Sequence, residues 1–384
     1  MEPVLPDSTN IKCFLDALLQ IEDKRDNRGK RHCLSFIIVA VVLAILCGRS
    51  KTSSIHRFIE NRIDWLRKVT QITRAKVISR AHLPRLIDKI SWDSLDQIIQ
   101  QHFKQYLSHP GIDREWKAID GKALRGSLKS GEKEAIIHVV AHDSRTEVTQ
   151  CRQSGEKSSE ITVVRQLLAK TGLDRHKISL DAHHCNPKTT AQIASKKGLY
   201  VTQVKNNQAV LRTQCQALSL IEKALFSSEH HEKSHGRLTS QYTTLYALKS
   251  MDLDDRWKAS QLSTLVVIRR DSLDIKKGKE SSGVSYYISN QPILETAKKE
   301  ASELTQAIRK HWGVESNNWI LDVTFNEDNV MVKAKNQAHI LGRLRGFVLQ
   351  LLKKIGIPNF QAAIEKYCDS TEKLETMLRQ VKFL

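Results

Sequence analysis

The sequence predicts an α/β protein in which a helical N-terminal domain precedes a mixed β-sheet with flanking helices, and a β-rich insertion interrupts the sheet domain. Three observations predict this. Residues 1–110 are patterned mostly as helices, whereas strand-like segments begin at Trp116. From there the order is strand, hairpin, helix, strand, helix, strand, which is typical of antiparallel strands followed by parallel strands joined through helices. Two of these strands end at an aspartate, Asp120 and Asp181.

The composition predicts a basic protein that binds a polyanion. The 384 residues include 61 Lys and Arg against 42 Asp and Glu, a formal net charge of +19. The basic residues are spread along most of the chain, which favours nucleic acid as the partner over ribosomal or membrane-surface contact. Seven scattered cysteines without a C-x-x-C pair indicate neither a disulfide framework nor a zinc finger. They favour a cytoplasmic location, and no signal peptide opens the chain.

The N-terminal domain, residues 1–110, is predicted to be a helical bundle with a basic loop. Residues 33–47 are apolar except for Ser35. Because this run is shorter than the ~20 residues of a membrane span, we expect a buried helix and no membrane partner. Ser91 is the expected N-cap of a helix over residues 91–107. Lys30 and Arg31, in the charged linker of residues 23–32, are candidate DNA contacts; a scaffold bundle with a merely solvated loop is the alternative.

The first strand of the sheet domain should end in a carboxylate and a basic turn. It begins at Trp116 and stops at Asp120, and glycines then flank Lys122 and Arg125. A carboxylate at a strand end is rigidly held, and the cations beside it suit a phosphate-bearing substrate. We therefore expect Lys122 and Arg125 to contact DNA. The alternative is a solvated turn in which Asp120 is only a turn former.

The next segments complete the first part of the sheet domain, residues 111–205. Strand-like residues 134–142 and 147–152 predict a hairpin, and helices are expected over 158–170 and 187–197. Short strands are expected over 177–180, ending at Asp181, and over 199–204. This is the order of a ribonuclease-H-like domain.

Residues 206–283 interrupt that order and are predicted to form an insertion with a small sheet of its own. A helix over 210–225, strands over 238–248 and 262–269, and a polar loop over 276–283 are expected there. A strand over 286–289 then returns to the core, residues 284–355 complete the sheet domain, and 356–384 form a C-terminal helical tail.

A long helical pattern after Pro292 offers a third carboxylate. Apolar residues recur at three and four residues through Ile308. The same spacing continues the stripe meant for the core to two aromatics and two acids, Trp312, Glu315, Trp319 and Asp322. The two tryptophans are expected to pack in the core, with stacking on a base as the alternative. We expect the helix to present acid to the two aspartates, unless it leaves the core here and the acids face water. Three such acids can hold two Mg²⁺ or Mn²⁺ ions for in-line phosphoryl transfer.

Five motifs occur in one order along the chain. They are Ile-Asp-Gly-Lys-Ala-Leu-Arg-Gly-Ser at 119–127, Asp-Ala-His-His-Cys-Asn-Pro-Lys-Thr-Thr at 181–190, Val-Lys-Asn-Asn-Gln at 204–208, His-Gly-Arg at 235–237, and His-Trp-Gly-Val-Glu-Ser-Asn-Asn-Trp-Ile-Leu-Asp-Val-Thr-Phe-Asn-Glu-Asp at 311–328. Together with Gly-Lys-Arg-His at 29–32 and Leu-Cys-Gly at 46–48, they resemble the bacterial insertion-sequence DDE transposases of the H-repeat-associated protein family. The resemblance covers nearly the whole chain.

This resemblance implies a catalytic core that cleaves and joins the DNA ends of an insertion sequence with metal ions. It implies Asp120, Asp181 and Glu315 as the catalytic acids and metal ligands, with Asp322 as a further candidate ligand. It also implies double-stranded DNA as partner, at element ends and target, and a homodimer on DNA. Lys205 is a further candidate DNA contact. A non-catalytic DNA-binding descendant and a structure-specific ribonuclease-H-like nuclease are the alternatives.

The sequence departs from the family pattern at two places. After Arg237 the family usually continues with an acid and an arginine, whereas this chain has Leu-Thr-Ser-Gln, so a DNA contact from Arg237 is the less secure expectation. The wider group spaces a Tyr, an Arg and a Lys around the third acid. This chain has Ile308, His311 and Asp322 at those spacings, so those roles are not carried over.

Overall fold

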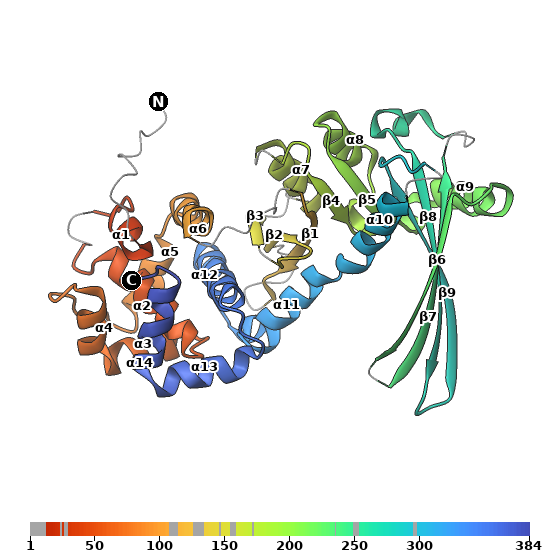
Figure 1. The fold of residues 1–384 in the computed structure, drawn as a ribbon. Helices are drawn as coiled ribbons and strands as arrows, with labels where there is room; N and C mark the ends of the chain where they lie inside the picture. The colour runs from red at the N-terminus through yellow and green to blue at the C-terminus, as the bar shows by residue number, and fades with distance from the viewer. Residues whose placement is uncertain are drawn as a thin grey trace.

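The computed structural model describes residues 13–23, 25–26, 30–106, 114–125, 134–145, 147–153, 159–170, 173–234, 236–248, 253–294 and 298–384. A nine-stranded sheet crosses the molecule, with a helical body at one end (Figure 1). At the other end is a long β-arm, formed by the strands over residues 226–234, 237–247, 264–274 and 279–289. The strand order is β3-β2-β1-β4-β5-β9-β8-β7-β6. The mixed α/β architecture that the sequence predicts is therefore confirmed.

The first five strands have the predicted order. They are β1 (Trp116–Ala123), β2 (Ala135–Ala141), β3 (Glu147–Gln153), β4 (Lys177–Leu180) and β5 (Leu199–Val204). β1 pairs antiparallel with β2 and β2 with β3, whereas β4 pairs parallel with β1 and β5 parallel with β4. Helices α7 (Glu160–Lys170) and α8 (Pro187–Ser195) supply the two crossovers on one face of this sheet (Figure 1).

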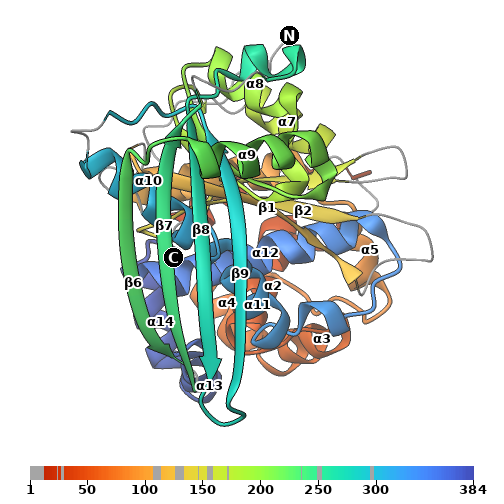
Figure 2. The same ribbon diagram turned by 90° about the vertical axis from the view of Figure 1, so that its right-hand side faces the viewer.

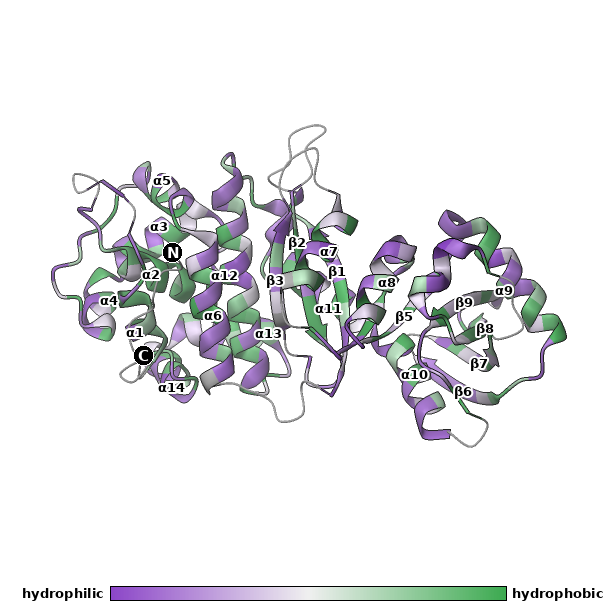
Figure 3. Cartoon of the chain, turned by 90° about the horizontal axis from the view of Figure 1, so that it is seen from above, coloured by the Kyte–Doolittle hydropathy of each residue, from purple (hydrophilic) through white to green (hydrophobic). Residues whose placement is uncertain are grey.

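The helical body combines both ends of the chain. It contains α1 (Phe14–Leu19), α2 (Leu34–Leu46), α3 (Thr52–Asn61), α4 (Ile63–Thr70), α5 (His82–Asp88) and α6 (Trp92–Tyr106), with α13 (Phe360–Asp369) and α14 (Thr371–Gln380). Every residue of α2 is buried, which confirms the expected buried helix (Figure 3). The backbone N–H of Phe14 donates to the carbonyl of Lys382, so the predicted C-terminal tail packs on the N-terminal helices. In the part of the chain that the structure describes, no helix is long and apolar enough to cross a membrane.

Helix α12 (Lys335–Lys354) joins the helical body to the sheet, and residues 337–352 are all buried. Its Arg343 is only 2 % exposed and forms ion pairs with Asp96 of α6 at 2.7 Å and Glu147 of β3 at 3.3 Å. Gly346 lies against Gln150 so closely that a Cβ there would be 2.7 Å from the Gln150 amide nitrogen. Close backbone approach and one shared cation therefore fix the helical body to the sheet.

The β-arm differs from the prediction in three respects. β6 (Phe226–Ser234) was not expected at all, although it pairs with β7 (Arg237–Ala247) along its whole length. The expected loop over 276–283 is wrong beyond Gly278, because β9 (Lys279–Ser289) begins there and pairs with β8 (Thr264–Asp274). Strands β6, β7, β8 and β9 lie side by side in that order (Figure 2), but the insertion has no separate sheet, because β9 pairs with β5. Both faces of the outer arm are largely exposed, so its polar sequence carries little strand signal.

The helical segment after the arm is broken in two. α10 (Lys298–Lys310) and α11 (Gly313–Val323) are separated by a turn at His311 and Trp312, and both lie on the sheet face opposite α7 and α8 (Figure 1). The buried face runs through Leu304 and Ile308 and continues in α11 as Val314, Asn317 and Leu321. The turn shifts the helical phase by one residue, so the expected core stripe of Trp312, Glu315, Trp319 and Asp322 is wrong.

Replacing Arg343 with alanine should lower the free energy of unfolding by about 3–5 kcal/mol, because buried Glu147 and partly buried Asp96 would lose their shared cation. The matched control is Arg67→Ala, whose partner Asp64 has a 90 % exposed side chain. That change should cost less than about 1 kcal/mol. Urea unfolding followed by circular dichroism measures both. Equal losses would show that Arg343 does not fix the helical body to the sheet.

Candidate active site

The structure brings Asp120 and Asp181 to neighbouring strands of the sheet. β1 and β4 run parallel with Ile119 paired to Leu180, so the next residue on each strand is an aspartate. Asp181 caps the short 3₁₀ helix η4 (Ala182–His184), and its Oδ1 accepts the backbone N–H of His184 at 3.2 Å. Parallel pairing therefore places both carboxylates at the same edge, as predicted.

Asp120 lies inside β1 rather than at its end, so the predicted basic turn is wrong at Gly121 and Lys122. The ladder to β2 continues through Ala123, because the hairpin partner extends that far. Burial, followed by the charges of Asp181 and Glu160, raises the pKa of Asp120 to about 6. Its Oδ2 accepts a hydrogen bond from Asn318 of α11 at 3.1 Å. The site thus holds a carboxyl group that resists ionisation.

Glu160 and Asn318 belong to this site and were not predicted. Glu160 begins α7, and its Oε1 lies 2.9 Å from Nε2 of His184. This contact, offset by burial, lowers the pKa of Glu160. The sequence feature that could have pointed to Glu160 is the glycine after Asp120. The Glu160 carboxylate occupies the space that a side chain at position 121 would fill. Asn318 gave no signal, since its role depends on the helical phase after the turn.

Glu315 lies in the first turn of α11 and is exposed to solvent. It precedes Asn318 by three residues, so the two side chains occupy the same side of the helix. Trp312 and Trp319 are 56 % and 62 % exposed, so the expectation that they pack in the core is wrong. The structure therefore places Glu315 one helical turn from the residue that contacts Asp120, without packing it against the aspartates.

Asp322 is paired with a lysine. Nζ of Lys122 lies 2.5 Å from Oδ1 of Asp322, 3.4 Å from Glu327 and 3.3 Å from Asp328. Burial alone would lower the pKa of Lys122, but the three carboxylates outweigh it and raise that pKa. Lys122 is 5 % exposed, whereas the side chain of Arg125 is 76 % exposed. Of the two predicted cations only Arg125 is open to solvent, and Lys122 ties β1 to the segment after α11.

The donor atoms around Asp120 fit a hard divalent cation. The carboxylates of Asp120 and Asp181 offer oxygen ligands, although Nδ2 of Asn318 already donates to Oδ2 of Asp120. Oδ1 of Asn318 is buried without a hydrogen-bond partner. Mg²⁺ commonly takes one or two carboxylates, with water and phosphate completing its shell. Among the described residues no three His, Cys, Asp or Glu side chains form a ready metal cluster. The two aspartates therefore offer oxygen ligands of the right kind, but among the described residues they do not form a complete metal site.

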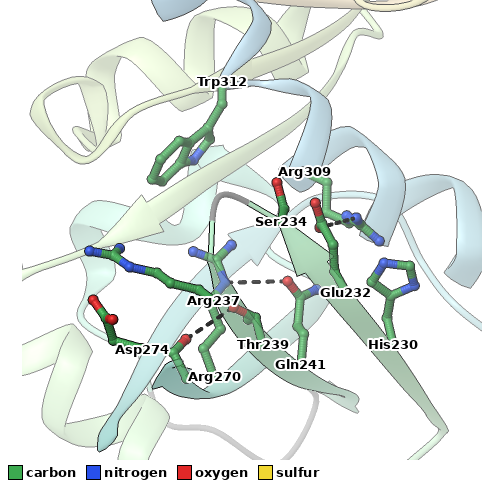
Figure 4. A pocket seen from close by; sticks show the side chains of 11 residues that line it. His230, Glu232, Ser234, Arg237, Thr239, Gln241, Arg270, Asp274, Arg309 and Trp312 are labelled. Carbon is green, nitrogen blue, oxygen red and sulfur yellow. Dashed lines mark hydrogen bonds and ion pairs between the residues drawn. The ribbon is translucent and has the colours of Figure 1, made fainter. Parts of the chain in front are cut away.

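A hollow of about 650 Å³ lies between the β-arm and the α10–α11 junction (Figure 4). Arg237, Arg270 and Arg309 line it together with Trp312. The Arg270 guanidinium lies 5.7 Å from the centre of the Trp312 ring and donates to Gln241 at 3.3 Å. Glu232 and Asp274 also line the hollow, and Glu232 is paired with Arg309 at 3.5 Å, so three arginines against two carboxylates leave it cationic by one charge. Because Trp312 directly precedes α11, this cationic hollow lies beside the helix that carries Glu315.

The other predicted DNA contacts are exposed but lie on separate parts of the molecule. Lys205 follows β5, and Lys30 and Arg31 precede α2 in the helical body. Lys24, Arg28, Gly29, Gly126, Ser127 and His235 lie outside the described residues.

Comparisons with known proteins agree with the resemblance found in the sequence. A family model described as "Transposase DDE domain" matches residues 117–349, and one described as "DDE_Tnp_1-associated" matches residues 15–103. The chain is 29 % identical over 360 residues to "Putative transposase YncI" of Escherichia coli O157:H7, covering 90 % of this chain and 88 % of that protein. It is 27 % identical over 352 residues to "H repeat-associated putative transposase YhhI" of Escherichia coli K12, covering 89 % and 90 %.

Asp120→Asn should stabilise the metal-free protein at pH 7.5. The unfolded chain loses this proton near pH 3.8 and the folded chain near pH 6. The contribution of Asp120 to stability is therefore largest below pH 3.8, falls as the pH rises through that window, and stays low above it. The gain at pH 7.5 should be on the order of 1–3 kcal/mol and should vanish at pH 3.5. Urea unfolding in EDTA, with Asp64→Asn as an exposed control, measures it. A gain that does not depend on pH would contradict this cause.

Proposed function

Because the chain belongs to the family of transposases with a DDE domain, we propose that it cleaves and joins the DNA ends of an insertion sequence by metal-dependent phosphoryl transfer. The observation that carries this proposal is the pairing of Asp120 and Asp181 at one edge of parallel strands β1 and β4. Their strand order also supports a ribonuclease-H-like core. No feature of the described site favours the inactive descendant or the structure-specific nuclease.

Asp120 and Asp181 are the proposed ligands of Mg²⁺ or Mn²⁺, two ions per site, with Glu315 as the third acid. When bound, such ions supply Lewis-acid activation of the nucleophile and neutralise charge on the scissile phosphate. Burial raises the pKa of Asp120, and a cation would favour its ionised form. Glu315 is exposed in the first turn of α11, so DNA bound along that helix could complete the site around it.

Asp322 is the weaker candidate ligand. Its carboxylate already has a buried cation, Lys122, at 2.5 Å. We therefore propose that Asp322 and Lys122 chiefly hold the end of α11 against β1. A DNA contact from Lys122 stays a prediction, and it would compete with three carboxylates for one ammonium group.

The proposed DNA path leads from the acids to the cationic hollow beside α11. Arg237 and Arg270 are suited to bind phosphate, and Trp312 offers an exposed aromatic face to a base. Arg125 and Lys205 are further proposed contacts near the strand ends. Lys30 and Arg31 would let the helical domain bind the flanking DNA duplex. A homodimer on DNA stays a prediction, which light scattering of the protein–DNA complex tests.

Asp120→Asn, Asp181→Asn and Glu315→Gln should each abolish strand cleavage while leaving DNA affinity largely unchanged, because each removes a metal ligand but no phosphate contact. The measurement is single-turnover cleavage of duplexes made from the DNA that flanks the gene, with Mg²⁺ or Mn²⁺, beside binding by fluorescence anisotropy. Glu303→Gln, an ion-paired carboxylate on α10, is the control. A variant that still cleaves would remove its residue from the catalytic set.

Arg237→Gln with Arg270→Gln should weaken binding to all duplexes and flatten its salt dependence. Each lost phosphate contact should lower the slope of log affinity against log salt by roughly 0.9. Lys30→Gln with Arg31→Gln tests the helical domain in the same way, and Lys258→Gln, an exposed lysine paired with Asp255, is the control. An unchanged slope for the arginine pair would place the DNA path elsewhere.

A further inference from the structure

We infer that Glu160 is a positioning residue that holds the two catalytic aspartates in register by joining β1 to the turn after β4. The inference rests on the proposed function, since it concerns the aspartates of the same site. It begins from the place of Glu160 at the start of α7, where its side chain is 27 % exposed and reaches both strands.

On the β4 side, Glu160 holds the turn that contains Asp181. Its Oε1 lies 2.9 Å from Nε2 of His184, whose side chain is fully buried. The backbone N–H of the same His184 donates to Oδ1 of Asp181. His184 is therefore fixed through its ring by Glu160 and in turn fixes the carboxylate of Asp181.

On the β1 side, Glu160 lies directly on the residue after Asp120. A Cβ added to Gly121 would be 2.6 Å from Cδ of Glu160 and less than 3 Å from both of its oxygens. The Glu160 carboxylate therefore lies against the backbone of Gly121. A side chain at position 121 would therefore displace the Glu160 carboxylate, which occupies the volume that the new side chain would fill.

The sheet separates Glu160 from the side on which Asp120 acts. Ile119 packs among residues of α7, and Gly121 lies on the same face of the strand because the alternation has a period of two. Asp120 faces the opposite side and contacts Asn318 of α11. Glu160 therefore supports the aspartates from the opposite face of the sheet and is not one of the proposed metal ligands.

A series of variants at Glu160 tests this role with a control of the same residue type. Glu160→Ala should lower the single-turnover cleavage rate at saturating DNA by roughly 10–100-fold, the usual effect of losing such a support, with DNA affinity unchanged. Glu160→Gln should recover most of the rate, because the amide oxygen can still accept a hydrogen bond from Nε2 of His184. Glu303→Ala is the control, since Glu303 is similarly exposed and hydrogen-bonded to Trp116 and Lys177, on α10. Equal rates for the two alanine variants, or a Gln variant as slow as the Ala variant, would overturn the inference.

Gly121→Ala provides a second, independent test, because this change does not remove any hydrogen-bonding group. It should slow cleavage by displacing Glu160, and in the double variant with Glu160→Ala its effect should disappear, because the clash is then gone. Losses that simply add would contradict the proposed contact. If Glu160→Ala fails to fold, as judged by circular dichroism, Gly121→Ala and Glu160→Gln carry the test.

Binding of Mn²⁺ to the full chain without DNA, followed by electron paramagnetic resonance, separates this inference from the proposed function. Glu160→Ala should weaken Mn²⁺ binding and Glu303→Ala should not. If the wild-type protein fails to cleave, the proposed function is overturned. The comparison of Mn²⁺ binding between Glu160→Ala and Glu303→Ala then decides the role of Glu160. Wild-type cleavage together with Mn²⁺ binding that ignores Glu160 would overturn the inference alone.

Discussion

The parallel pairing of β1 with β4 places two carboxylates side by side in a partly buried edge, and the rest of the site follows from this constraint. Like charges at short range and loss of water both oppose ionisation, which is why the pKa of Asp120 rises to about 6. A protein keeps such a pair only when the surrounding structure holds it in place. Here that support comes from both faces of the sheet, through α7 on one side and α11 on the other.

The support on the α11 side depends in turn on buried charge pairs further away. Lys122 holds the segment after α11 through three carboxylates, and one of these, Glu327, is also paired with Arg345 of α12 at 3.3 Å. Arg345 donates to the carbonyl of Ser50 in the helical body. A continuous chain of polar contacts therefore runs from the helical body to the strand that carries Asp120. The contacts that hold the helical body against the sheet therefore also help to position Asp120.

The sequence was sufficient wherever a local pattern decides the outcome. The buried strand β4 with Asp181 after its end, the apolar helix α2 and the placement of Asp120 on the neighbouring strand could all be predicted, because adjacent residues show burial and periodicity. It was insufficient where a long-range contact decides. Lys122 looked like part of a basic turn because its three acidic partners are 200 or more residues away. Glu160 was not identified for the same reason, since its partners Gly121 and His184 lie on other elements. One turn at His311 was enough to move the inward face of α11 by a residue.

The cations that make up the excess positive charge fall into two groups: those buried in ion pairs and those open to solvent. A net charge of +19 favours a polyanion partner, but it does not say which cations are free to bind one. Lys122, Arg343 and Arg345 are buried and neutralise carboxylates that fix the fold, whereas Arg237, Arg270 and Trp312 line an open hollow. Because the hollow is formed by the arm and by the start of α11 together, an arm that merely extends the sheet also becomes a wall of the proposed DNA path. On the proposed DNA path, the insertion would therefore connect DNA contacts in the hollow with the helix that carries Glu315.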